Sequence, residues 1–318
     1  MSSQELRAAQ IRPRTWRLSA LPATPGWRPS SGDGESVIRL YVRPHLGHVR
    51  LQALSGGHLN GLYAQLEQAG MSIATRRLVQ AVLGRALKDA ERWGRVPRNV
   101  ARQADQPARD ATRATAWTGR ELARFLEHVR ADRLYALWRL AATTGMRRGE
   151  LLGLTWRALD LDAARLHVEQ QLVPTRGGVT FGPPKSRRSR RTVALDPDTV
   201  RVLRDHRDAQ IVERALAGVA YRDHDLVFAD PLGEPIYPER LTEWFAAHRK
   251  AVGIPTGTLH TLRHTAATLA LTAGVPVHIV AARLGDDAKT VLSTYAHLLP
   301  QSDEMAAERV AAVLAGVV

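Results

Sequence analysis

The segment of the chain that carries most structural information is residues 259–298, LHTLRHTAATLALTAGVPVHIVAARLGDDAKTVLSTYAHL. His260 and Arg263 lie three residues apart in a segment that predicts a helix, so both side chains project from one face. Leu262 and Leu269 line the neighbouring apolar face. We therefore expect one helix that is anchored in a core and presents two side chains suited to binding phosphate.

Tyr295 lies further along the chain, on a second, short predicted helix that begins after Gly285. A tyrosine hydroxyl is a poor nucleophile at neutral pH because its reference pKa is roughly 10, so it needs cationic or proton-accepting neighbours. His260 and Arg263 are neighbours of that kind.

Four short blocks of sequence occur in a characteristic order. They are Thr-Gly-Met-Arg-Arg-Gly-Glu-Leu at 144–151, His-Thr-Leu-Arg-His at 260–264, Leu-Gly at 284–285 and Thr-Tyr-Ala-His at 294–297. Together they resemble the signature of the tyrosine recombinases, the phage-integrase family, over roughly Ser36 to Leu299. The resemblance implies a mainly α protein with a small antiparallel β-sheet, organised as a two-domain DNA clamp with a small helical core-binding domain and a mixed catalytic domain.

The resemblance also implies the catalytic residues, which are Arg147, Lys185, His260, Arg263, Asp286 and the nucleophile Tyr295. Tyr295 is expected to attack a DNA phosphodiester, giving a 3′-phosphotyrosyl enzyme and a free 5′-hydroxyl. The two arginines would clamp the non-bridging oxygens, His260 would assist proton removal or orient the phosphate, and Lys185 would protonate the departing oxygen. Glu150 is expected to orient the Arg147 guanidinium, although in isolation this Arg–Glu spacing equally describes a surface ion pair of little energy.

Residues 160–195 change to the alternation of β-strands, with strands predicted at 166–173, 179–181 and 191–195. Between the second and third strands the chain reads Pro-Pro-Lys-Ser-Arg-Arg-Ser-Arg-Arg. A basic hairpin tip there would contact DNA through Arg187, Arg188 and Arg190, or would be a solvated loop. Lys185 is the only lysine between 88 and 250. A lysine shifts its pKa and transfers a proton more readily than arginine.

Asp286 departs from the family pattern, which usually places His or Trp directly after Leu-Gly. His and Trp donate a hydrogen bond to phosphate, whereas an ionised Asp only accepts one and repels the anion. Three interpretations stay open. Asp286 acts in protonated form, Asp287 and the following helix N-terminus rearrange the local contacts, or the enzyme is slow or inactive.

Composition limits the remaining classes of function. The 318 residues are sufficient for two domains, and 45 Lys+Arg against 31 Asp+Glu give a net charge of +14, which favours a polyanionic partner or a solvated basic surface. The absence of cysteine excludes disulfides, thiolate zinc sites and cysteine catalysis. We find no apolar run typical of a signal peptide or membrane span, and expect a cytoplasmic protein with no membrane partner. No acidic or histidine cluster suggests a metal and there is no P-loop, so we expect no cofactor.

The chain divides into four predicted segments. Residues 1–35 form a flexible basic arm, either a truncated accessory-site domain or a disordered tail. Residues 36–107 form the helical, SAM-like core-binding domain, with Arg76 and Arg77 as DNA contacts. Residues 108–117 are a polar linker, and residues 118–318 are the catalytic domain.

We therefore predict a site-specific recombinase that integrates or excises a phage or mobile element, acting on double-stranded recombination sites. The resemblance implies a homo-tetramer on synapsed DNA, exchange of a C-terminal helix between subunits, and accessory DNA-bending or directionality proteins. Two alternatives have no catalytic role. One is a decayed integrase that only binds DNA, and the other is a regulator that uses the helix-turn-helix-like residues 272–285.

Overall fold

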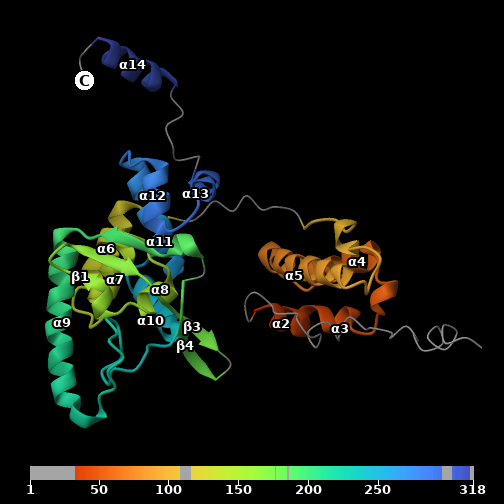
Figure 1. Cartoon of the computed structure of the whole chain (residues 1–318), viewed down its shortest axis with the longest axis horizontal. Coiled ribbons are helices and arrows are strands. Elements are labelled where there is room, and N and C mark those ends of the chain that lie inside the picture. Colours follow the sequence, from red (N-terminus) through yellow and green to blue (C-terminus); the bar gives the residue numbers. More distant parts are fainter. Residues whose placement is uncertain (1–32, 108–115, 176, 185, 296–302, 316–318) are drawn as a thin grey trace, which may run out of the picture. The chain divides into compact units, whose positions relative to one another are not determined.

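The computed structural model describes residues 33–107, 116–175, 177–184, 186–295 and 303–315 (Figure 1). The chain forms two compact units, residues 1–112 and 113–318, and each has its own hydrophobic core. Residues 1–32 of the predicted arm and 108–115 of the predicted linker lie outside the described residues, whereas residues 33–35 of the predicted arm begin a helix. No described helix is both long and apolar enough to cross a bilayer.

The first unit is helical throughout its described part. Its elements are α2 Asp33–Val37, the π-helix η2 Ile38–Val42, α3 Arg43–Leu46, η3 Leu51–Ala53, α4 Gly56–Gln68, α5 Ile73–Arg92 and η4 Val100–Arg102. Ser55 and Ser72 begin α4 and α5 because each side chain accepts a hydrogen bond from a free backbone N–H of the first turn. Leu59 on α4 and Leu83 on α5 are fully buried in the core of this unit.

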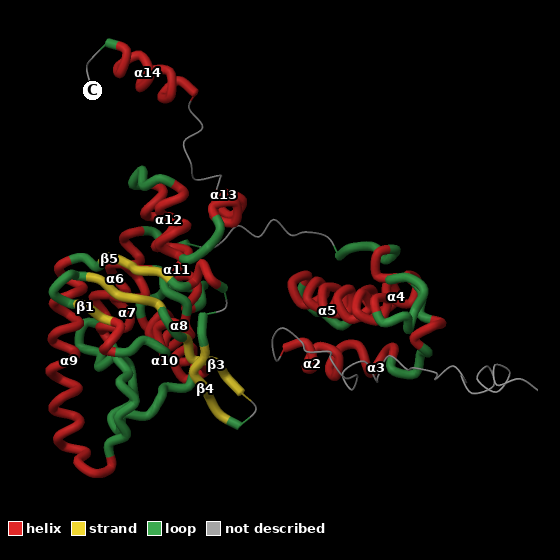
Figure 2. The backbone as a smooth tube through the Cα atoms, viewed as in Figure 1, coloured by secondary structure: helices red, strands yellow, loops and turns green. Residues whose placement is uncertain are grey.

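The second unit is a helical assembly with two small sheets on its surface (Figure 2). Its helices are α6 Gly119–His128, α7 Tyr135–Thr144, α8 Arg148–Leu152, η5 Trp156–Ala158, η6 Arg187–Ser189, α9 Pro197–Ala217, η7 Gly218–Ala220, α10 Pro238–Ala251, α11 Leu259–Thr272, α12 Val277–Leu284, α13 Ala288–Tyr295 and α14 Asp303–Leu314. The predicted capping box at Thr118 and Glu121 does begin α6. Trp117, Phe125 and Phe245 form an aromatic cluster in its core, with ring centroids 5.3 to 5.6 Å apart.

The β-structure differs from the prediction of one three-stranded sheet. Strands β1 Leu159–Asp160, β2 Arg165–Val168 and β5 Arg191–Ala194 form one antiparallel sheet in the order β1-β2-β5, and β3 Gln171–Thr175 pairs only with β4 Gly178–Gly182.

The predicted strand 166–173 is therefore wrong as a single element. It changes sheets at Glu169 and Gln170, and the Gln170 side chain donates to the carbonyl of Gly153 at 2.9 Å. Gly153 permits this because a Cβ there would lie 2.8 Å from the backbone of Gln171. The residues between β4 and β5 consequently connect two sheets and are not a hairpin tip. The fold class, mainly helical with small antiparallel β-structure, is confirmed.

Helix α11 positions the functional residues. It packs against α6 and α7 on one side and against α12 on the other, and α13 packs on α12. Leu262 is fully buried in the main core, whereas Leu271, Leu284 and Val291 form a smaller cluster that attaches α12 and α13. Residues far apart in sequence therefore meet around the N-terminal half of α11.

Candidate active site

Arg263 lies on the buried face of α11, with only 4% of its side chain exposed. Its Nη1 donates to the carbonyl of Gly145 at 2.6 Å, and its Nη2 donates to the carbonyl of Leu284 at 2.9 Å. Gly145 has a left-handed backbone (φ +65°), and a Cβ there would lie 2.6 Å from the Leu284 side chain. The guanidinium is therefore held in place by the C-terminal ends of α7 and α12.

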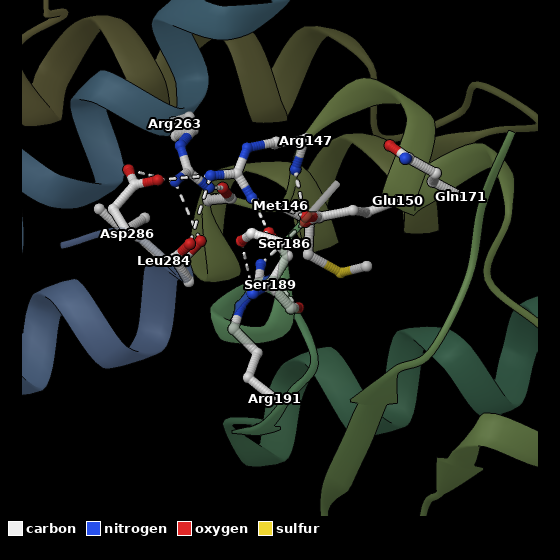
Figure 3. Close-up of polar contacts among 12 residues, drawn as sticks. Met146, Arg147, Glu150, Gln171, Ser186, Ser189, Arg191, Arg263, Leu284 and Asp286 are labelled. Atoms are coloured by element: carbon white, nitrogen blue, oxygen red, sulfur yellow. Dashed lines mark hydrogen bonds and ion pairs between the residues drawn. The ribbon is translucent and has the colours of Figure 1, made fainter. Parts of the chain in front are cut away.

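Arg147 lies just before α8 and faces Arg263 (Figure 3). Its Nη1 donates to Glu150 Oε1 at 2.8 Å, and its backbone N–H donates to Glu150 Oε2 at 3.0 Å. The structure thus brings Glu150 to the guanidinium that it was expected to orient.

Glu150 also binds Arg191, whose Nη2 lies 2.9 Å from Glu150 Oε2. Burial alone would raise the pKa of Glu150, but the hydrogen bond and charge of Arg191, together with Arg147, lower it. Glu150 is therefore an ionised, buried carboxylate shared by two guanidiniums. We did not predict a site role for Arg191, because in sequence it is one of several arginines in a basic run.

Asp286 bridges the two predicted catalytic arginines. Its Oδ2 lies 2.5 Å from Arg263 Nη2, and its Oδ1 accepts from Arg147 Nη2. It follows Gly285, which ends α12 in a left-handed conformation. Arginine side chains bind phosphate oxygens through the same kind of N–H···O contacts that they make with this carboxylate. The Asp286 carboxylate therefore occupies an anion-binding position between the two guanidiniums.

Tyr295 ends α13 and is 5% exposed. Its hydroxyl lies 2.5 Å from Nδ1 of His264, and the His264 ring lies edge-on to that of His260 with centroids 4.6 Å apart. Burial raises the pKa of Tyr295 to about 12, although the charge of Arg263 opposes this rise. Burial, His264 and Arg263 lower the pKa of His260 to about 4. The tyrosine thus needs a proton acceptor, and both histidines are neutral at pH 7.

His264 was missing from the predicted site. The signal that could have found it is its spacing, because residues four apart on a helix share a face and His264 follows His260 by four.

The remaining predicted residues are not joined to this cluster by described contacts. Lys185 lies outside the described residues, as does the side chain of Arg187. Arg188 forms an ion pair with Asp287, and Arg190 is exposed. Arg77 is half-buried in the first unit, where Arg76 lies 2.7 Å from Glu67 and is 11% exposed.

The arrangement combines two guanidiniums that share one carboxylate with a tyrosine hydroxyl that is hydrogen-bonded to a neutral imidazole of helix α11. Groups of these kinds could together carry out phosphoryl transfer. The model of the phage integrase family matches residues 117–302, so the chain belongs to that family. The resemblance noted in the sequence is therefore confirmed.

The names of two relatives agree with this assignment. The chain is 30% identical to a "Tyrosine recombinase XerC-like" protein of Caldanaerobacter subterraneus subsp. tengcongensis, covering 62% of this chain and 54% of the relative. It is 26% identical to an integrase of Saccharopolyspora erythraea, covering 92% and 79% respectively. The chain thus spans about half the length of the first relative and most of the second.

Two DNA-bound structures have a similar fold. The Tn1549 transposon integrase in complex with a circular intermediate DNA superposes with a TM-score of 0.77 at 19% identity, covering 92% of this chain and 99% of that one. A lambda integrase dimer bound to a COC′ core site gives 0.63 at 19% identity, covering 89% and 94%.

Proposed function

We propose that this chain is a site-specific DNA recombinase that cuts and rejoins double-stranded DNA through a 3′-phosphotyrosyl bond to Tyr295. Its role would be the integration or excision of a phage or other mobile element. The observation that carries the proposal is the convergence of Arg147 and Arg263 on one carboxylate, beside the α13 tyrosine that contacts the same helix, α11. The names of the relatives, which include several integrases, support it.

The chemistry follows from these positions. The Tyr295 oxygen forms a bond to phosphorus, the bond from phosphorus to the 5′-oxygen breaks, and the leaving oxygen takes a proton. Arg147 and Arg263 stabilise the charge on the non-bridging oxygens, and Glu150 holds Arg147 in place. Lys185 remains our candidate for the proton donor, with His260 assisting at the phosphate. Because the phosphotyrosyl bond conserves the energy of the broken linkage, a new 5′-hydroxyl can displace Tyr295 without a nucleotide cofactor.

Asp286 bears directly on this reaction. Its carboxylate lies between the guanidiniums that the scissile phosphate requires. We propose that the scissile phosphate displaces the Asp286 carboxylate when DNA binds. The carboxylate then lies beside the reacting phosphate and no longer between the guanidiniums.

Asp286 also favours the second candidate function, an integrase that binds DNA without cutting it. A carboxylate that kept its position between the arginines would repel the scissile phosphate. The comparisons give this alternative no support.

The partners we propose are double-stranded recombination sites, a homo-tetramer on synapsed DNA and accessory DNA-bending or directionality proteins, with the reaction taking place in the cytoplasm. One of the solved structures of similar fold is a lambda integrase tetramer bound to a Holliday junction. The exposed Val310 and Val313 on α14 are compatible with the proposed exchange of this helix between subunits.

The test uses nicked duplexes in which cleavage releases a short strand and so traps the covalent intermediate. Active duplexes are selected from a random-sequence pool by retention on the protein in SDS. We expect the wild type to form an SDS-resistant adduct and Tyr295→Phe to form none. An adduct with Tyr295→Phe would show that the nucleophile is wrong. DNA binding by the wild type with no adduct from any duplex would favour the DNA-binding-only protein.

A further inference from the structure

The hydroxyl of Tyr295 faces a histidine and not an arginine. Among the described residues its hydrogen-bond partner is His264, with 2.5 Å between Oη and Nδ1. The arginine nitrogens that reach the centre of the site instead donate to carboxylates, to carbonyls and to the Ser189 hydroxyl. A guanidinium has no lone pair available to accept a proton, whereas a neutral imidazole has one.

We propose that His264 is a catalytic residue that accepts the proton of the Tyr295 hydroxyl as that hydroxyl attacks phosphorus. This inference rests on the proposed recombinase function. The O–H bond of Tyr295 breaks, its electron pair forms the new bond to phosphorus, and the proton moves to Nδ1 of His264. The bond from phosphorus to the 5′-oxygen breaks, its electron pair stays on that oxygen, and the oxygen takes a proton from the candidate donor Lys185. In rejoining, the same proton returns to the departing tyrosine.

The surroundings of His264 suit this task. On α11 it is flanked by His260, whose ring lies edge-on at 4.6 Å, and by Arg263. Tyr295 faces it from α13, and the charge of Asp286 reaches it from the connection between α12 and α13. The His264 ring thus contacts the rings of His260 and Tyr295, and its Nδ1 is directed at the tyrosine hydroxyl.

Protonation states agree with the direction of this transfer. Burial and the charge of Arg263 lower the pKa of His264, and Asp286 opposes that shift. The imidazole is therefore neutral at pH 7, and the tyrosine, with a pKa raised to about 12, keeps its proton. The hydroxyl is the donor and Nδ1 the acceptor, so the neutral imidazole carries its own proton on Nε2. Asp286 would then stabilise the imidazolium that forms when the proton arrives.

A structural role for this hydrogen bond makes a different prediction. If His264 only attached α13 to α11, an acceptor of similar shape without basicity would replace it. Asn is that acceptor, because its side-chain carbonyl takes approximately the position of Nδ1 and accepts a hydrogen bond but does not take up a proton near neutral pH.

The experiment measures single-turnover adduct formation on saturating nicked duplex, with DNA affinity measured separately. We expect His264→Asn to bind DNA as the wild type does and to cleave about 10²- to 10⁴-fold more slowly. The matched control is His278→Asn, because His278 is an exposed histidine on α12. This variant should cleave at the wild-type rate. Because the pKa of His264 is lowered from that of an ordinary histidine, the wild-type rate should fall only at pH values below that ordinary pKa, where His264 becomes protonated. This acid limb should be absent in His264→Asn.

A second substrate distinguishes the loss of a general base from the loss of a general acid. With sulfur replacing the 5′-bridging oxygen, the leaving group needs no proton, so a variant that has lost its general acid is rescued. His264→Asn should stay slow on this duplex. Rescue there, or a wild-type rate and pH profile on the ordinary duplex, would overturn the proposal.

Folding is monitored by thermal melting. If His264→Asn does not fold, the wild-type acid limb and the rescue of His264→Ala by added imidazole decide the question, and the absence of both overturns the proposal. A wild type that forms no adduct would refute the recombinase function itself, whereas a wild-type adduct with an equally fast His264→Asn refutes only the role of His264.

Discussion

At the scale of single residues, Asp286 distinguishes this chain from the pattern of its family. A hydrogen-bond donor is usual at this position, but here a carboxylate links the two arginines. The same residue therefore has two opposing effects. It offsets part of the charge of two neighbouring guanidiniums, and it occupies the position between them that we propose for the scissile phosphate.

Asp286→Asn removes the charge and keeps the shape of the side chain. We expect the free energy of unfolding to fall by about 1–3 kcal/mol, because the buried Arg263 loses its carboxylate partner. In a Tyr295→Phe background we expect DNA to bind more tightly, because no anion competes with the phosphate. Urea denaturation and fluorescence anisotropy measure the two effects.

Asp287→Asn is the control for this prediction. Asp287 pairs with Arg188 at the surface, where their side chains are 44% and 67% exposed. Such a pair contributes about 1 kcal/mol or less. Weaker DNA binding by Asp286→Asn than by this control would show that the carboxylate does not compete with phosphate.

At the scale of elements, the site depends on how α12 ends. Gly285 has a left-handed backbone (φ +68°), and a Cβ there would lie 2.9 Å from Arg191 Nη1 and 3.1 Å from the carbonyl of Arg188. Arg191 is itself held by Glu150. A substitution at Gly285 would therefore displace Arg191. Through Glu150, which binds both arginines, it would also change the position of Arg147.

Gly285→Ala and Gly274→Ala separate this effect from backbone strain. Both glycines are left-handed, but a Cβ at Gly274 (φ +81°) would meet nothing within 4 Å. We expect Gly274→Ala to lower the free energy of unfolding by about 1–2 kcal/mol, with adduct formation unchanged. Gly285→Ala should cost more and slow adduct formation. If both variants lost the same free energy of unfolding and formed adduct equally well, Arg191 would be able to move without affecting the site.

At the scale of the whole molecule, the chain is two units with separate cores. Stability should therefore be lost locally when one core is damaged.

Leu83→Ala tests this independence. Leu83 is fully buried in α5, so its truncation should cost the first unit about 2–5 kcal/mol. Hydrogen exchange followed by mass spectrometry should then speed up across 33–107 and remain unchanged in α7 and α11. Leu78→Ala on the same helix, where the side chain is 45% exposed, should change little. Faster exchange in both units would mean that they unfold together.

The sequence by itself determined the helices around the site, the family, and the identity of Arg147, Arg263 and Tyr295 as candidates. Helical periodicity and capping depend on residues three or four apart, so they can be read locally. The change of sheet at Glu169 and Gln170 could not be read in this way, because it depends on a contact with Gly153 from another element.

Only the tertiary structure decided which charged and polar groups meet. Asp286 reaches Arg263 across 23 residues of sequence, Tyr295 reaches His264 across 31, and Arg191 reaches Glu150 across 41. No local pattern selects these partners, because many arginines and two histidines fit the same spacing. The packing of α12 and α13 on α11 selects them, since it sets which side chains share one partly buried site.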